Sequence, residues 1–161
     1  MPRSGVEQIL YLLDEAFERS EHSLIVNLAS VGDEAWQWQP PGGERTIAQI
    51  AEHVGECKFM YANHAFGDAK MFWQQFAARN ATLPGKDEMI EWLREGQALF
   101  RGYVAAMEND YELMTPRKAN WGQEYETRWL IATIIEHDIY HAGEINHIRA
   151  LAQGNDAWPE Y

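Results

Sequence analysis

Apolar residues recur every three or four positions along most of the chain, which is the spacing of one face of an α-helix. The pattern predicts four amphipathic helices separated by three clusters of helix-breaking residues, at 32–43, 80–85 and 115–123. The apolar positions are Val6, Leu10, Leu13, Phe17, Leu24 and Leu28 in the first segment, Met89, Leu93, Phe100, Tyr103 and Met107 in the third, and Leu130, Ile134, Ile148 and Leu151 in the fourth.

The ends of these segments carry their own signals. Thr46 and Gln49 form a capping-box pair at the start of the second helix, and Gly154 is a plausible stop for the fourth. Strand-like alternation is absent, and each helix is about 22–28 residues long, or about 33–42 Å at 1.5 Å per residue. The sequence therefore predicts an all-α four-helix bundle in a single domain, 1–161, with a long first crossover loop that carries Trp36 and Trp38.

The apolar stripe of the fourth helix contains polar residues at its centre. It consists of Leu130, Ile134, His137, His141, Glu144, Ile148 and Leu151, in alternating steps of four and three. Polar groups in such a stripe are unfavourable unless they find partners. Either hydrogen bonds to core neighbours or a metal ion would satisfy the two imidazoles, which share one face because they are four residues apart.

The second helix has a matching anomaly. Its stripe can be drawn through Thr46, Ile50, His53, Cys57, Met60 and His64. If the second and fourth helices face each other, His53 can meet His137 and His141. Three neutral imidazoles plus one open position are a common ligand set for a divalent metal. Cys57 is either a small hydrophobic core residue or a fourth ligand, which would close the site.

Two better-known metal motifs fit less well. The HExxH motif of zinc peptidases requires a glutamate where this chain has Asp138, and its longer form requires glycine where this chain has Glu144. The apolar pattern continues beyond this point, so His147 falls off the stripe and is expected to flank the site. A di-iron bundle needs two Glu-x-x-His pairs, and only Glu144 with His147 matches.

The composition disfavours several classes of binding partner and indicates a cellular location. The net charge of −12 disfavours nucleic acid and anionic membranes as partners. The single cysteine, Cys57, fits the reducing cytoplasm, because no intrachain disulfide can form. The first ten residues lack the apolar core of a signal peptide, and no apolar run is long enough to span a membrane. These features predict a cytoplasmic protein with a small-molecule substrate.

Three stretches together resemble the DinB/YfiT-like family of four-helix-bundle metalloenzymes. They are RTIAQIAEHVGE (45–56) on the second helix, the preceding WQWQPPGGERT (36–46), and EHDIYHAGEI (136–145) on the fourth. The resemblance implies that His53, His137 and His141 are metal ligands and that Glu144 stands where the family has Gln or Glu. It further implies a divalent ion, nickel or zinc first, and a homodimer. Family members include transferases and isomerases that use a low-molecular-weight thiol as cosubstrate.

Two functional classes follow. The first is a metal-dependent enzyme that performs thiol transfer, isomerisation or hydrolysis on a small molecule, because an open metal position activates and orients substrates. In this class Glu144 is the candidate general base, or alternatively an anchor for one of the imidazoles. The second class is a non-catalytic bundle in which the ion only joins the second helix to the fourth.

Overall fold

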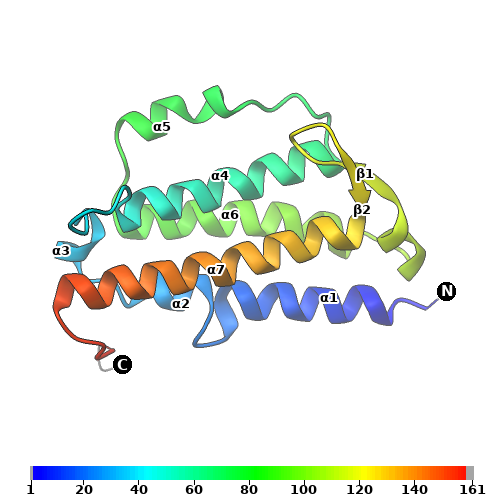
Figure 1. Cartoon of the computed structure of the whole chain (residues 1–161). Coiled ribbons are helices and arrows are strands. Elements are labelled where there is room, and N and C mark those ends of the chain that lie inside the picture. The colour runs from blue at the N-terminus through cyan, green and yellow to red at the C-terminus, as the bar shows by residue number, and fades with distance from the viewer. Residues whose placement is uncertain (1, 159–161) are drawn as a thin grey trace.

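The computed structural model describes residues 2–158. Most of them are helical, which confirms the predicted all-α class (Figure 1). The elements in chain order are α1 (Ser4–Asp14), the π-helix η1 (Glu15–Arg19), α2 (Leu24–Ala29), α3 (Asp33–Trp36), α4 (Ile47–Phe66), the 3₁₀ helix η2 (Trp73–Phe76), α5 (Ala77–Ala81), α6 (Lys86–Ala105), the 3₁₀ helix η3 (Asp110–Met114), β1 (Pro116–Lys118), β2 (Glu124–Glu126) and α7 (Thr127–Gln153).

Four rods form the bundle. The α1–η1–α2 unit, α4, α6 and α7 run side by side, and α4 packs against both α6 and α7 (Figure 1). The predicted signals at the helix ends are confirmed. Thr46 and Gln49 form a reciprocal capping box at the start of α4, and Gly154 adopts a left-handed conformation (φ 74°) at the end of α7. Within residues 2–158, no helix is both long and apolar enough to cross a membrane.

The first rod is not the continuous helix that the spacing predicts. Phe17 and Leu24 are two helical turns apart, so the apolar pattern is compatible with an unbroken helix across the six intervening residues. All six are polar, and no apolar side chain among them can hold that segment against the core. The chain instead widens into η1, where the amide of Ser20 donates to the carbonyl of Glu15 at 3.4 Å, and then restarts as α2.

Two connections also differ from the prediction. The helix α4 ends at Phe66, before the predicted break at 80–85, because Gly67 follows and the Asn63 carbonyl accepts from the amides of Gly67 and Ala69. The segment that follows runs back along the outer side of α4 and includes α5 (Figure 1). The predicted third break contains a small antiparallel hairpin, β1–β2, whose three-residue strands are too short to produce a visible alternation. In the first crossover loop, Trp36 belongs to α3 and is buried.

The contact between α4 and α6 depends on Gly55. A Cβ atom at this position would lie 2.2 Å from the Trp92 ring, so the two helices approach more closely than any side chain there would allow. We expect Gly55→Ala to lower the free energy of unfolding by about 1–3 kcal/mol, because the ring or the helix must shift. Urea unfolding measures the change.

Gly102 provides the matched control for that substitution. Like Gly55 it lies within a long helix, here α6, but no atom within 4 Å would meet its added Cβ. Gly102→Ala should therefore be neutral or stabilising by about 0.5–1 kcal/mol. Equal effects of the two substitutions would contradict the close approach at Gly55.

The buried face of α7 is rotated relative to the predicted stripe. Asp138 is fully buried in the bundle centre, whereas His137 is half-buried at the edge that faces α4, and Leu151 is exposed. On α4, Lys58 is likewise fully buried. His141 is buried as well, so the histidines lie along the α4–α7 seam, and Lys58 and Asp138 form an ion pair in the bundle centre.

Candidate metal centre

The imidazoles of His53, His137 and His141 converge on one point between α4 and α7. His137 Nε2 lies 3.2 Å from Nε2 of His53 and 3.2 Å from Nε2 of His141. The ring centroids of His53 and His141 are 5.3 Å apart. This convergence follows from the helix spacing, because His137 and His141 share one face of α7, and His53 lies on the facing side of α4.

Glu144 fixes which nitrogen of His141 faces the other rings. Its Oε2 lies 2.7 Å from His141 Nδ1, and both of its oxygens accept from Arg45 Nη2, at 3.0 and 3.3 Å. An ionised carboxylate can only accept, so His141 donates from Nδ1 and keeps the lone pair on Nε2. Metal-binding histidines are commonly held in this way by a carboxylate on the other ring nitrogen.

Burial keeps the three rings neutral. It lowers the pKa of His53 and of His141 below the ordinary value, although Glu144 partly opposes the shift at His141. For His137, burial is again the largest cause, and the neighbouring His141 and His53 add to it, so that its pKa falls to about 3. A metal ligand must be neutral imidazole, and these rings are therefore ready to bind at neutral pH.

The spacing of the three rings also fits an ion. Two imidazole nitrogens, each about 2.0–2.1 Å from a tetrahedral Zn²⁺, are about 3.4 Å apart. The two Nε2–Nε2 distances of 3.2 Å, from His137 to His53 and from His137 to His141, are close to this value. By geometry and by charge, the residues present fit a divalent cation.

Cys57 lies at the same point, one helical turn after His53. Its Sγ is 3.9 Å from Nδ1 and 3.8 Å from Nε2 of His53. Ligand atoms of His53, Cys57 and His137 all lie within 4.8 Å of one another, so this trio is also a group that could hold an ion. Burial, however, raises the pKa of the thiol to about 12, and without an ion the sulfur stays protonated.

The sequence profile of the DinB superfamily matches residues 16–145, most of the chain and all of the converging histidines. The chain belongs to the DinB superfamily. A solved structure of a DinB-like protein from Bacillus cereus ATCC 10987 is similar to it with a TM-score of 0.69. The alignment covers 98% of this chain and 96% of that one at 16% identity, which supports the fold. A search of curated proteins found no match.

Behind the histidines, this member of the DinB superfamily has a buried ion pair that the sequence did not reveal. Lys58 Nζ donates to Asp138 Oδ2 at 2.7 Å and to Gln97 Oε1 at 2.9 Å. Each charged residue directly follows a residue of the site, since Lys58 is next to Cys57 and Asp138 next to His137. The pair therefore joins α4 to α7 directly behind the candidate metal centre.

The remaining histidines of this DinB-superfamily chain lie away from the convergence point. His64 Nε2 is 2.9 Å from the carbonyl oxygen of Met71, so His64 connects the end of α4 to the segment that follows it. His22 is exposed beside Glu21. His147 lines a cavity on the other side of Glu144, which agrees with its predicted flanking position.

Proposed function

We propose that the protein is a divalent-metal-dependent enzyme in which His53, His137 and His141 hold the ion and a small molecule is the substrate. The proposal is supported mainly by one observation: the Nε2 atoms of three neutral imidazoles converge between two helices. A divalent ion held by three imidazoles supplies Lewis acidity and an open position for a substrate. Thiol transfer, isomerisation and hydrolysis are the reaction classes that this chemistry supports.

In this proposal Glu144 serves as the anchor of His141. Both of its oxygens already accept hydrogen bonds from Arg45, and one of them faces His141 Nδ1. These contacts hold the imidazole in the tautomer and orientation that a ligand needs. The anchor role is therefore better supported than that of a free general base. The expected homodimer, single domain and cytoplasmic location are proposed on the family resemblance and the composition.

The test uses wild-type protein purified without an affinity tag. Elemental analysis should find about one nickel or zinc ion per chain, as three ligands for a single ion require. A screen of thiol-transfer reactions should find turnover that a chelator abolishes and that added metal restores. Metal below about one ion in ten chains, after growth with nickel and zinc, would contradict the proposal.

A second candidate is a non-catalytic bundle in which the ion is structural. The position of Cys57 favours it, because a thiolate ligand would complete a closed four-ligand site. The enzyme proposal predicts instead that Cys57→Ala changes the affinity for Zn²⁺ by less than about threefold, since the sulfur is a neighbour and not a ligand. A competition titration against a chromophoric chelator measures this change.

The spectrum of the Co²⁺-loaded protein separates the two candidates further. A cobalt–thiolate bond produces an intense near-ultraviolet band, which the enzyme proposal predicts to be absent from the resting wild-type protein. A strong band that Cys57→Ala removes, together with a large loss of affinity, would establish the closed site. Cys57→Ser serves as the isosteric companion variant.

A further inference from the structure

A cavity of about 420 Å³ lies next to the metal centre, on the side of Glu144. One wall is the loop that leads into α4, and the other is the C-terminal half of α7. The polar and charged side chains that line it include Arg45, Glu144 and His147. Since Glu144 lines the cavity and also contacts His141, the cavity and the histidines share this carboxylate as a common wall.

The loop wall has a defined shape. The Gly43 amide donates to the carbonyl of Pro40 at 2.8 Å, and Gln39 Nε2 donates to the carbonyl of Gly43 at 2.8 Å. A Cβ atom on Gly43 would lie 2.5 Å from Pro40 Cγ, so only glycine fits this turn. The turn places Arg45 directly at the start of α4, facing Glu144.

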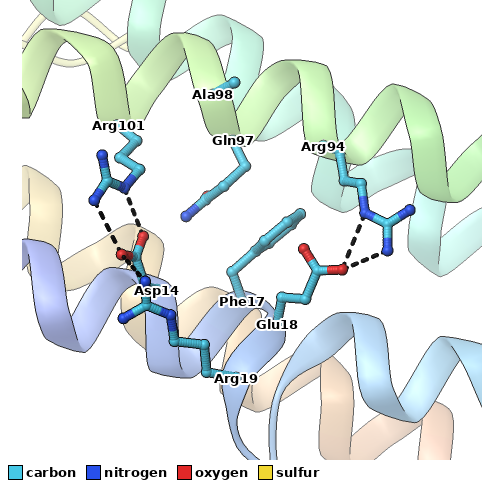
Figure 2. Close-up of a pocket in the computed structure, with 8 residues that line it drawn as sticks. All are labelled: Asp14, Phe17, Glu18, Arg19, Arg94, Gln97, Ala98 and Arg101. Atoms are coloured by element: carbon cyan, nitrogen blue, oxygen red, sulfur yellow. Dashed lines mark hydrogen bonds and ion pairs between the residues drawn. The ribbon is translucent and has the colours of Figure 1, made fainter.

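Arg45 has hydrogen-bond donors that make no contact with Glu144. Only its Nη2 bonds to Glu144, and among residues 2–158 its Nε and Nη1 have no hydrogen-bond partner. Two of the three arginines that line a larger cavity, between η1 and α6, use more of their donors (Figure 2). There, Arg101 presents Nε and Nη2 to Asp14 at 2.7 and 3.0 Å, and Arg94 uses Nε and Nη2 on Glu18 and Nη1 on Glu91. In Arg94 and Arg101, the edge formed by Nε and Nη2 is therefore already bound to a carboxylate.

We propose that this cavity is the substrate's anion subsite: Arg45 binds a carboxylate of the substrate through N–H groups that its contact with Glu144 leaves free, while the reacting group occupies the metal centre. Arginine suits this task because its planar donors match a carboxylate. His147, on the opposite wall, lines the same space. The proposal rests on the proposed function and narrows its substrate class to small molecules that carry a carboxylate.

The local charges agree with an anionic ligand. Glu144 is paired with the Arg45 guanidinium and accepts a hydrogen bond from neutral His141, and Glu44 is exposed, where water screens its charge. The guanidinium of Arg45 also contributes to the lowered pKa of His53, His137 and His141, as expected for a cation close to all of them. In a chain of net charge −12, such a cation beside the candidate site indicates a specific role in recognition.

The test uses pairs of thiols that bind the Co²⁺-loaded protein and differ in one group. Mercaptocarboxylic acids of two to six carbons are compared with mercaptoalcohols of equal length, and the cobalt–thiolate absorption band reports binding of each. In wild-type protein, the best-fitting acid should bind about tenfold or more tightly than its alcohol, as one additional charged hydrogen-bonded contact implies. In Arg45→Met the preference should fall below about twofold, with alcohol binding unchanged.

Arg128→Met is the matched control, because it removes an equal charge from an exposed ion pair with Glu126 near the start of α7. It should keep the full preference for the acid. If acids and alcohols bind wild-type protein equally at every length, or if the preference survives in Arg45→Met, the anion subsite is wrong while the proposed function stands. If cobalt binds but no thiol of either series does, the open metal position fails, and the subsite fails with it.

Discussion

Replacing His53 by alanine is expected to lower the affinity for Zn²⁺ or Ni²⁺ by at least about a hundredfold. Loss of a group that merely orients a ligand already costs about 10–100-fold, and loss of the ligand itself should cost more. His53 is the only imidazole that α4 contributes to the convergence point, so its removal separates the ion from one of the two helices. Competition with a chelator of known affinity measures the loss.

His64→Ala is the control for this experiment. It removes the same side chain from the same helix, but at a position where the ring contacts the carbonyl of Met71 and not the other histidines. This variant should retain wild-type affinity for the metal. An unchanged metal stoichiometry in His53→Ala would show that the three-histidine assignment is wrong.

The second large effect is expected from the buried ion pair. Lys58→Met should lower the free energy of unfolding of the metal-free protein by about 3–5 kcal/mol, because it leaves the Asp138 carboxylate buried without its counter-charge. Asp138 is fully buried, and its Oδ1 has no hydrogen-bond partner among the described residues even with Lys58 present. Urea unfolding in the presence of a chelator separates this effect from metal binding.

The double variant Lys58→Met/Asp138→Leu shows whether the pair itself stabilises the fold. Removing both charges leaves apolar groups of similar size in the core, and such replacements are often neutral or stabilising. The double variant should therefore recover most of the stability lost in the single variant. Lys70→Met, at an exposed position, controls for the loss of a lysine and should change the stability by less than about 0.5 kcal/mol. If Lys58→Met lowered the free energy of unfolding by less than about 1 kcal/mol, a buried charged pair of Lys58 and Asp138 would be contradicted.

The bundle was predictable because its signals are local. Helical spacing, the Thr46–Gln49 capping box and the stop at Gly154 each depend on residues within one or two turns. The meeting of His53 with His137 and His141 required one further assumption, that the second and fourth helices face each other. Helix packing in the structure supplies that contact.

Other features depend on contacts between distant segments. The spacing of apolar residues on α7 fits two buried faces that differ by one residue. The prediction chose the face with His137, whereas the structure buries Asp138 more deeply. The partner of Asp138, Lys58, lies 80 positions away in the chain, and the other acceptor of Lys58, Gln97, lies 39 positions from that lysine. A lysine among the apolar residues of α4 was the only signal in the sequence. No local pattern could have indicated that Arg45 meets Glu144, 99 residues further along.

The central claim is that one divalent ion lies between α4 and α7, held by three imidazoles. X-ray absorption at the metal edge, on Zn²⁺-loaded wild-type protein and on Cys57→Ala, tests it most directly. The expected result is three nitrogen neighbours with imidazole scattering at about 2.0–2.1 Å, identical in the two proteins. A sulfur neighbour at about 2.3 Å in the wild type that is lost in Cys57→Ala, or fewer than three imidazoles in both, would contradict it.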